Sequence, residues 1–277
     1  MAENRIEAAL ERARQRRKED KRPDSTHVPT VEQVPAPRQP MPRFPELGFD
    51  REGCIAKRIL ISEHGARWNA GADASYRMLR TRILQRIRSN RWTTIGVTSP
   101  AQGDGKSLTT LNLALSIARE GNSNVFLIDL DMRNPTLCPS LGVVPSLEIN
   151  DYLAGAGRPE DLLFSIGVDK LTLAGTITST NQASELLATR GVERLFAYIR
   201  SIAPQPIVLI DLPPVLATDD ALVVAPMVDA CLLVLSEGRS RRDSAAEAIA
   251  LLSEFTLAGI VMNRSRAAIK DYHYSYS

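Results

Sequence analysis

The clearest chemistry in this 277-residue chain lies in a glycine-rich loop that ends in Gly105-Lys106-Ser107. Gly103 and Gly105 allow consecutive backbone N–H groups to turn toward a polyphosphate, and a helix that begins there adds its partial positive charge. Lys106 would reach the terminal phosphates, and the hydroxyl of Ser107 would ligate Mg²⁺. The consensus for such a loop has glycine where this chain has Pro100. The alternative to a phosphate-binding loop is therefore a glycine-rich turn that carries a Lys-Ser pair by chance. Further motifs are needed to exclude it.

Two apolar runs that end in carboxylates strengthen the interpretation of a phosphate site. Asp129 and Asp131 follow the run at 124–128, and Asp211 follows the run at 207–210. Parallel strands bring their carboxyl ends to one edge of a sheet, which is where such folds bind ligands. The alternation of side chains predicts that Asp129 and Asp131 point the same way, and two like charges so placed need a nearby cation. In nucleotide-binding proteins of this kind an acid at the Asp211 position holds Mg²⁺.

The elements that must position these residues alternate between strands and helices. Short apolar runs predict strands at 93–97, 124–128, 171–174, 207–210, 229–235 and 258–263. Apolar positions at helical spacing predict helices at 108–118, 181–187 and 242–255. Asn181 is the expected N-cap of the helix at 181–187. This alternation predicts an α/β fold with a mostly parallel sheet and helices on both faces.

Composition narrows the class of protein. The formal net charge of +2 gives no general reason to expect nucleic-acid binding. The three cysteines are far apart and lack the spacing of metal ligands, which favours a reducing compartment over a disulfide framework. The first residues contain no apolar secretory core, and no apolar stretch reaches the roughly 20 residues of a membrane helix. We expect a soluble, cytoplasmic protein unless a partner brings it to a membrane.

The distribution of proline and charge divides the chain into three segments. Residues 1–55 combine a basic helical stretch with a proline-rich linker, and we expect this tail to be largely disordered. Residues 56–265 carry the periodic apolar pattern of the α/β domain. Residues 266–277 form a polar C-terminal tail.

Half of the six tyrosines lie in that C-terminal tail, at Tyr272, Tyr274 and Tyr276. Tyrosines usually lie in cores and interfaces, whereas chain ends are normally disordered. A spacing of two residues cannot line one face of a helix. The tail is therefore either a set of accessible hydroxyl groups or a segment that docks on a partner without modification.

With these motifs assembled, the chain resembles the bacterial tyrosine kinase (BY-kinase) family, whose members act in capsule and exopolysaccharide synthesis. The resemblance covers residues 58–265 and the tail. It is carried by the loop at 103–107, by Asp129-Leu-Asp131-Met-Arg133-Asn-Pro135 and by Ile210-Asp211-Leu-Pro213-Pro214. The motif with two aspartates is the most specific, because few phosphate-loop groups follow a strand with Asp-x-Asp-x-Arg. The segment at 181–187 also matches a family pattern, from which Ala183 departs.

The resemblance implies a P-loop NTPase fold of the MinD/ParA type that binds ATP and Mg²⁺. It assigns catalysis to Lys106, Asp129, Asp131 and Arg133. One of the two aspartates would assist deprotonation of the attacking tyrosine and the other would help to hold Mg²⁺. The expected metal ligands are Ser107, Asp131 and Asp211, and the expected nucleotide contacts are Gly103, Asp104, Gly105, Lys106, Ser107, Leu108 and, beside the adenine base, Asn263.

The implied activity is ATP-dependent protein-tyrosine autophosphorylation, with Tyr272, Tyr274 and Tyr276 modified in trans by a neighbouring subunit. Such a kinase would regulate capsule or exopolysaccharide polymerisation and export. The implied partners are a membrane polysaccharide co-polymerase that activates the kinase and a cognate tyrosine phosphatase. The N-terminal segment also resembles that of soluble members encoded with exosortase-linked polysaccharide systems.

A helix predicted at 73–87 bears on oligomerisation. Arginines on a helix are usually solvated, but arginine also pairs well with carboxylates across interfaces. The oligomerisation helix of the family reads Glu-x-x-Arg-x-x-Arg, which Arg77 and Arg80 fit, whereas Ala74 stands in the glutamate position. We expect a homo-oligomer, and this departure leaves ring and dimer both open.

Two other functions compete with the kinase. An ATPase switch of the MinD/ParA type usually has lysine at the start of the loop, where this chain has Ala101, which favours the kinase. A nucleotide-binding, non-catalytic regulator of polysaccharide export is the second alternative, because the altered oligomerisation helix does not exclude it.

Overall fold

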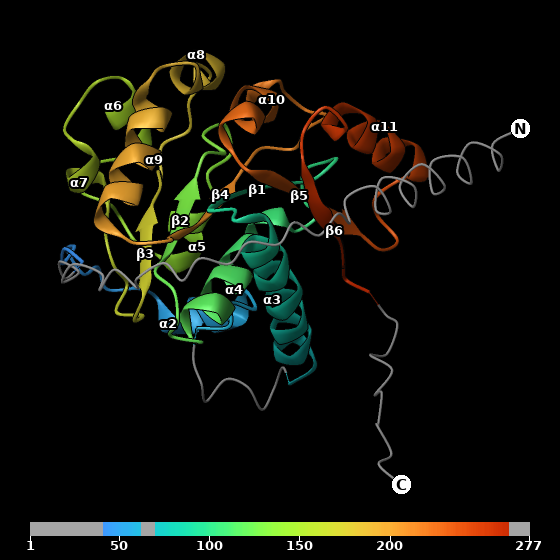
Figure 1. Cartoon of the computed structure of the whole chain (residues 1–277), viewed down its shortest axis with the longest axis horizontal. Helices are drawn as coiled ribbons and strands as arrows, with labels where there is room; N and C mark the ends of the chain where they lie inside the picture. Colours follow the sequence, from blue (N-terminus) through green and yellow to red (C-terminus); the bar gives the residue numbers. More distant parts are fainter. Residues whose placement is uncertain (1–40, 62–69, 266–277) are drawn as a thin grey trace, which may run out of the picture. The chain divides into compact units, whose positions relative to one another are not determined.

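The computed structural model describes residues 41–61 and 70–265, which Figure 1 shows in colour. Most of the predicted N-terminal tail, up to residue 40, lies outside the described residues, and so does the C-terminal tail with Tyr272, Tyr274 and Tyr276. The disorder expected for both segments therefore stays a prediction.

Six parallel strands form the centre of the fold. Their order across the sheet is β3-β2-β4-β1-β5-β6, so β1 lies inside the sheet and the later strands are added on both sides. The strands are β1 (Thr94–Thr98), β2 (Val125–Asp129), β3 (Leu171–Ala174), β4 (Ile207–Asp211), β5 (Ala230–Ser236) and β6 (Leu257–Asn263). The predicted α/β fold with a parallel sheet is confirmed, because every predicted strand is present.

Successive side chains in the central strands face two different hydrophobic cores. In β2, Val125 and Leu127 belong to one core, whereas Phe126 and Ile128 belong to the other. Side chains alternate across a strand, so a sheet that is covered on both faces needs continuously apolar strands. This requirement explains the unbroken apolar run of β4, in which every residue is buried.

Helices cover both faces of the sheet (Figure 1). The first core contains residues of α2, α3, α4 and α5, and the second contains residues of α6 to α11. The helices are α2 (Arg51–Ala56), α3 (Ala70–Asn90), α4 (Lys106–Ala118), α5 (Leu137–Leu141), α6 (Ile149–Leu153), α7 (Pro159–Leu162), α8 (Ala183–Leu187), α9 (Gly191–Ile202), α10 (Asp220–Val224) and α11 (Arg242–Leu252). A short 3₁₀ helix, Ala225–Met227, follows α10.

An N-terminal arm, residues 41–61, packs on the domain, which therefore begins earlier than the predicted boundary at residue 56. Cys54 and Ile59 of the arm are buried in the first core. The backbone N–H of Leu60 donates to the side chain of Asn112 in α4 at 2.8 Å. The proline-rich composition suggested a linker, but the apolar residues of the arm are spaced too irregularly to be recognised as part of a core.

The predicted cap at Asn181 is wrong. Helix α8 begins at Ala183 with Gln182 at the N-cap, and no side chain caps it. The backbone carbonyl of Asn181 instead accepts a hydrogen bond from the guanidinium of Arg133. Local sequence favoured a cap, but a tertiary contact sets where this helix begins.

Within the part of the chain that the structure describes, we find no helix with both the length and the apolarity needed to span a bilayer.

Replacing Ile59 with alanine tests whether the arm contributes to the core. Ile59 is 2% exposed, and truncating a buried isoleucine costs about 2–5 kcal/mol because a cavity remains. Urea denaturation should show this loss in the free energy of unfolding. Val144→Ala is the control, because Val144 is 67% exposed and a surface change costs within about 0.5 kcal/mol. Unchanged stability of Ile59→Ala would mean that the arm does not pack on the domain.

Candidate functional site

The phosphate-binding loop, residues 99–105, joins β1 to α4. Gly103 and Gly105 have backbone φ angles of 83° and 90°, a left-handed region that favours glycine. Asp104 is fully buried, and its carboxylate accepts from the backbone N–H of Ala101 at 3.1 Å. These contacts turn the loop back on itself before α4 begins at Lys106.

Asn263, at the end of β6, lies directly against this loop. Its side-chain amide donates to the backbone carbonyl of Asp104 at 2.9 Å. A Cβ atom at Gly105 would lie 2.0 Å from the amide nitrogen of Asn263, so no larger residue fits there. The structure therefore brings Asn263 to the loop, and its contact with the adenine base stays a prediction.

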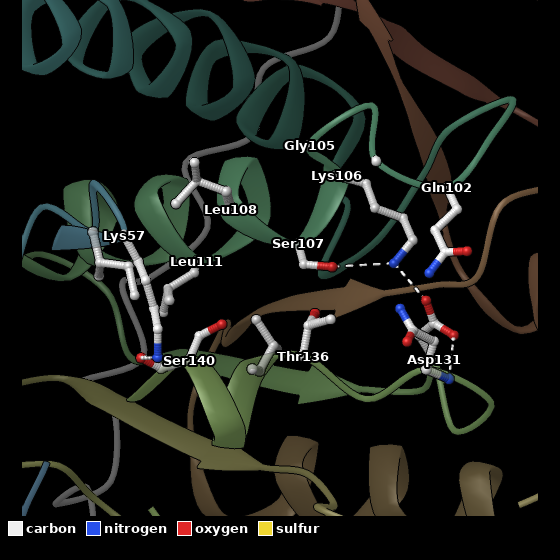
Figure 2. A pocket seen from close by; sticks show the side chains of 14 residues that line it. Lys57, Gln102, Gly105, Lys106, Ser107, Leu108, Leu111, Asp131, Thr136 and Ser140 are labelled. Carbon is white, nitrogen blue, oxygen red and sulfur yellow. Dashed lines mark hydrogen bonds and ion pairs between the residues drawn. The ribbon is translucent and has the colours of Figure 1, made fainter. Parts of the chain in front are cut away.

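The ammonium group of Lys106 points toward the carboxylate of Asp131 at the edge of the sheet (Figure 2). Its Nζ atom is 2.6 Å from Asp131 Oδ2 and 3.6 Å from Asp211 Oδ2. It also lies 3.1 Å from the hydroxyl oxygen of Ser107. Four residues chosen from sequence thus converge on one point, although they come from three separate elements.

In this cluster, burial and the neighbouring charges shift the pKa values in opposite directions. Burial alone lowers the pKa of Lys106, but the nearby Asp211 and Asp131 outweigh it, so the pKa of this ammonium is raised. Burial also raises the pKa of Asp211, although Lys106 acts in the opposite direction. Lys106 is therefore held firmly in its charged form.

Asp129 has different partners from Asp131, which corrects the expectation that the two acids point the same way. Strand β2 ends at Asp129, so strand alternation does not extend to Asp131. The Asp129 carboxylate accepts from the backbone N–H groups of Asp131, Thr136 and Leu137 at 3.1 to 3.3 Å. Burial, with the neighbouring Asp211, raises the pKa of Asp129 to about 8. Asp129 thus shapes the loop after β2, and Asp131 contacts Lys106.

The donor set at this edge fits Mg²⁺. Both carboxylate oxygens of Asp211 are buried and have no hydrogen-bond partner among the described residues. Mg²⁺ prefers oxygen ligands and is usually bound by one or two carboxylates together with substrate phosphates and water. Residues 41–61 and 70–265 contain no group of three or more His, Cys, Asp and Glu side chains that could hold a metal ion. Two carboxylates and the Ser107 hydroxyl meet the smaller requirement of Mg²⁺.

A cavity of about 300 Å³ opens beside Lys106. Its walls come from the phosphate-binding loop, α4, the segment after β2, α5 and the N-terminal arm. The lining residues are Lys57, Ile59, Gln102, Gly103, Gly105, Lys106, Ser107, Leu108, Leu111, Asp131, Asn134, Thr136, Leu137 and Ser140. Leu108, predicted to contact nucleotide, lies on this wall (Figure 2).

Arg133, predicted to be catalytic, is bound to a different part of the site. Its Nε atom lies 2.6 Å from Asp220 Oδ2, and Nη2 donates to Asp220 Oδ1 and to Ser184. Burial alone raises the pKa of Asp220, but hydrogen bonds from Arg133, Ser184 and Thr218 outweigh it, so this pKa is lowered. Arg133 thus ties the loop after β2 to α8 and α10, and no contact brings it to Lys106.

The two predicted oligomerisation residues have unequal surroundings. Arg80 lies 3.2 Å from Glu120 and donates to the backbone carbonyl of Ser116 at 3.0 Å, both in the same chain. Among the described residues, Arg77 pairs with Asp73 alone, one turn earlier, and its side chain is 60% exposed. Arg77 is therefore the more accessible of the two.

Sequence reasoning missed three residues that the fold brings to the site. The Arg239 guanidinium donates to the backbone carbonyl of Gln102 at 3.2 Å and lies against Gly103. Asp220 anchors Arg133, and Lys57 reaches the cavity from the arm. Only Arg239 had a signal in the sequence, since it follows an apolar strand as Asp129 and Asp211 do.

Comparison with known proteins connects this site to a family. No family model matches the chain. The tyrosine-protein kinase YwqD of Bacillus subtilis is 29% identical over 203 residues, which cover 73% of this chain and 84% of that protein. The solved BceF tyrosine kinase domain is 26% identical with a TM-score of 0.64, covering 80% of this chain and 93% of that one. The predicted resemblance to bacterial tyrosine kinases is confirmed by these relatives.

The fold has a second similarity, which concerns architecture alone. The cell division ATPase MinD of Pyrococcus furiosus has a TM-score of 0.50 with this chain and is 23% identical, over 61% of this chain and 69% of that one. The predicted P-loop fold of the MinD type is therefore confirmed.

Neutralising Asp220 tests the tie between Arg133 and α10. Asp220→Asn should lower the free energy of unfolding at pH 7 by about 1.5–3 kcal/mol, the range for hydrogen bonds to charged groups. Because the pKa of Asp220 is below its usual value in the folded protein, its stabilisation is present above about pH 4 and is lost as the pH falls further. The difference between variant and parent should therefore shrink in acid.

Asp169→Asn is the control, since Asp169 is exposed and lies before β3, away from the contacts of Arg133. Denaturant unfolding at pH 7 and at pH 3 measures all three proteins. A deficit for Asp220→Asn that is as large at pH 3 as at pH 7 would contradict the electrostatic account.

Proposed function

We propose that this chain, a homologue of bacterial tyrosine-protein kinases, is an ATP-dependent protein-tyrosine autokinase that regulates capsule or exopolysaccharide polymerisation and export. The observation that carries the proposal is the buried cluster of Lys106, Asp131 and Asp211 behind the phosphate-binding loop. Phosphoryl transfer requires mainly positioning and charge compensation, and this cluster supplies both. The curated relatives are tyrosine-protein kinases by name, which supports a kinase over an ATPase switch or a non-catalytic regulator.

The triphosphate would lie along the phosphate-binding loop. Backbone N–H groups at Gly103 and Gly105 and the beginning of α4 would face its oxygens. Asn263, which contacts the carbonyl of Asp104, is suited to a contact with the adenine base. Asp104 keeps the loop closed through Ala101 rather than touching the nucleotide.

Lys106 would change partners when the nucleotide binds. Its ammonium is held at 2.6 Å by Asp131, so a terminal phosphate must compete with this carboxylate. When Lys106 turns to the phosphate, the carboxylate of Asp131 loses its ion pair. Nucleotide binding would thus free Asp131 to bind Mg²⁺ and to take part in accepting the phenolic proton.

Ser107, Asp131 and Asp211 would hold Mg²⁺. The ion would neutralise negative charge on the phosphates as it builds up during transfer. The buried carboxylate of Asp211, which lies near Lys106 but accepts no hydrogen bond from the described residues, supports this assignment. Asp129 also holds the loop that carries Asp131, since its carboxylate accepts from backbone N–H groups.

In the reaction, a tyrosine oxygen would bond to the terminal phosphorus while the bond to the bridging oxygen breaks and ADP leaves. The phenolic proton would pass to the aspartate pair of Asp129 and Asp131, whose two roles we do not divide. The acceptors would be Tyr272, Tyr274 and Tyr276 of a neighbouring chain. Each phosphate adds about −1.5 to −2 charges, which would alter how the tail binds a basic surface.

Regulation would involve other proteins. A membrane polysaccharide co-polymerase would activate the kinase and recruit it to the inner face of the membrane. A cognate tyrosine phosphatase would reverse the modification. A homo-oligomer would bring tail and site together, and the exposed Arg77 is the better-placed contact for it.

Lys106→Met tests the phosphate site. The variant should lose phosphoryl transfer from labelled ATP by at least about 100-fold, because preorganised charge stabilisation is removed. Mg²⁺-ATP should raise the melting temperature of the parent and not that of the variant. Lys170→Met is the control, since Lys170 precedes β3 at the opposite edge of the sheet. Equal autophosphorylation by Lys106→Met and the parent would refute the site.

Replacing Tyr272, Tyr274 and Tyr276 with phenylalanine tests the acceptors. The triple variant keeps the rings and removes only the hydroxyl groups, so it should incorporate no phosphate of its own. It should still phosphorylate a Lys106→Met chain added in trans, which phosphopeptide mapping would detect. Phosphate incorporation at the parental level would place the acceptors elsewhere and leave the tail as a docking segment.

A further inference from the structure

We infer that the cavity beside Lys106 binds an acceptor tyrosine that follows an acidic residue, and that Lys57 of the N-terminal arm pairs with that acid. The occupant is the Asp271-Tyr272 segment of a second copy of the chain. This inference rests on the proposed kinase function and adds to it the preference of the site for its substrate.

The cavity has a reactive end and a cationic end (Figure 2). Lys106, Ser107 and Asp131 line the first, and Lys57 with Ser140 lines the second. Between them the wall is mainly apolar, and the apolar side chains are those of Ile59, Leu108, Leu111 and Leu137. An aromatic ring with a polar tip fits such a wall, because tyrosine combines an apolar body with a hydroxyl group.

Nucleotide leaves this part of the cavity free in the proposed arrangement. The phosphates lie on the loop, and the base is assigned to Asn263. Asn263 does not line the cavity, although it contacts the loop at the carbonyl of Asp104. Beyond Leu108, the apolar wall is made by Ile59, Leu111 and Leu137, none of which is assigned to the nucleotide.

The ammonium group of Lys57 is held in place by hydrogen bonds to the backbone. Its ammonium donates to the backbone carbonyls of Pro139 and Ser140 at 3.1 and 3.2 Å. A lysine ammonium has three N–H donors, so one remains for a ligand. None of the ion pairs in the described part of the chain involves Lys57. A carboxylate from outside the domain can therefore pair with it.

Charge complementarity selects the occupant. Asp271 directly precedes Tyr272, whereas Tyr274 follows His273 and Tyr276 follows Ser275. Tyr272 is therefore the tail tyrosine that directly follows an acidic side chain, and it can place this carboxylate beside Lys57 while its ring lies along the apolar wall. The arm thus contributes a contact that distinguishes one tail tyrosine from the other two.

The experiment separates enzyme from substrate. The enzyme carries phenylalanine at the three tail tyrosines, and the substrate is the Lys106→Met chain with its natural tail. Lys57→Met in the enzyme should slow modification of Tyr272 by about two- to fivefold, the effect of an exposed ion pair. Asp271→Asn in the substrate should do the same. Combining both changes should cause no further loss, and Lys57→Arg should restore most of the rate.

Three readouts keep the test specific. Modification of Tyr276 should be unaffected by Lys57→Met, and the shift in melting temperature by Mg²⁺-ATP should stay at the parental value. The preference for Tyr272 should weaken as salt is added, because exposed ion pairs are screened. Multiplying losses in the double variant, or equal effects on Tyr272 and Tyr276, would overturn the inference.

Failure of the proposed kinase function can be distinguished from failure of the pairing between Lys57 and Asp271. If the enzyme modifies no tyrosine of the substrate chain, the kinase proposal is wrong. Binding of a labelled peptide of residues 266–277, followed by fluorescence anisotropy, then tests the cavity alone. Weaker binding on Lys57→Met and on Asp271→Asn in the peptide supports the pairing, and unchanged binding overturns it.

Discussion

The contact between the ammonium of Lys106 and the carboxylate of Asp131 is the interaction on which the site depends. Lys106 also faces Asp211, and Asp129 lies close enough to influence its charge. Burial penalises each charge in this cluster, and removing one partner of a buried pair is costly. The cluster is therefore stable only while the strands and the loop hold these groups in place, and an added cation would relieve the remaining negative charge.

The order of the strands in the sheet brings Lys106, Asp131 and Asp211 together. β4 lies between β1, which leads into the phosphate-binding loop, and β2, which leads into Asp131. Asp129 and Asp211 are direct register partners at the ends of β2 and β4. Since both faces of the sheet are covered by packed helices, the strand ends have little freedom to move apart. The rigid sheet thus keeps the distances between these side chains nearly constant at the place where phosphate chemistry would occur.

The loop after β2 is held at two points, and this leaves Asp131 free to serve the site. Asp129 binds the backbone of Thr136 and Leu137, and Arg133 binds Asp220. Asp129 and Arg133 therefore both hold the loop that brings Asp131 to Lys106.

The sequence alone determined the strands, the phosphate-binding loop and the acids that end two of the strands. These features depend on local spacing and on apolar periodicity, which a single chain displays directly. Only the tertiary structure decided that Arg133 binds Asp220, that Asn181 is no cap, and that the arm delivers Lys57 to the cavity. Those choices depend on residues far apart in the chain, and the competition among possible partners for a charged group is settled only when packing fixes their distances.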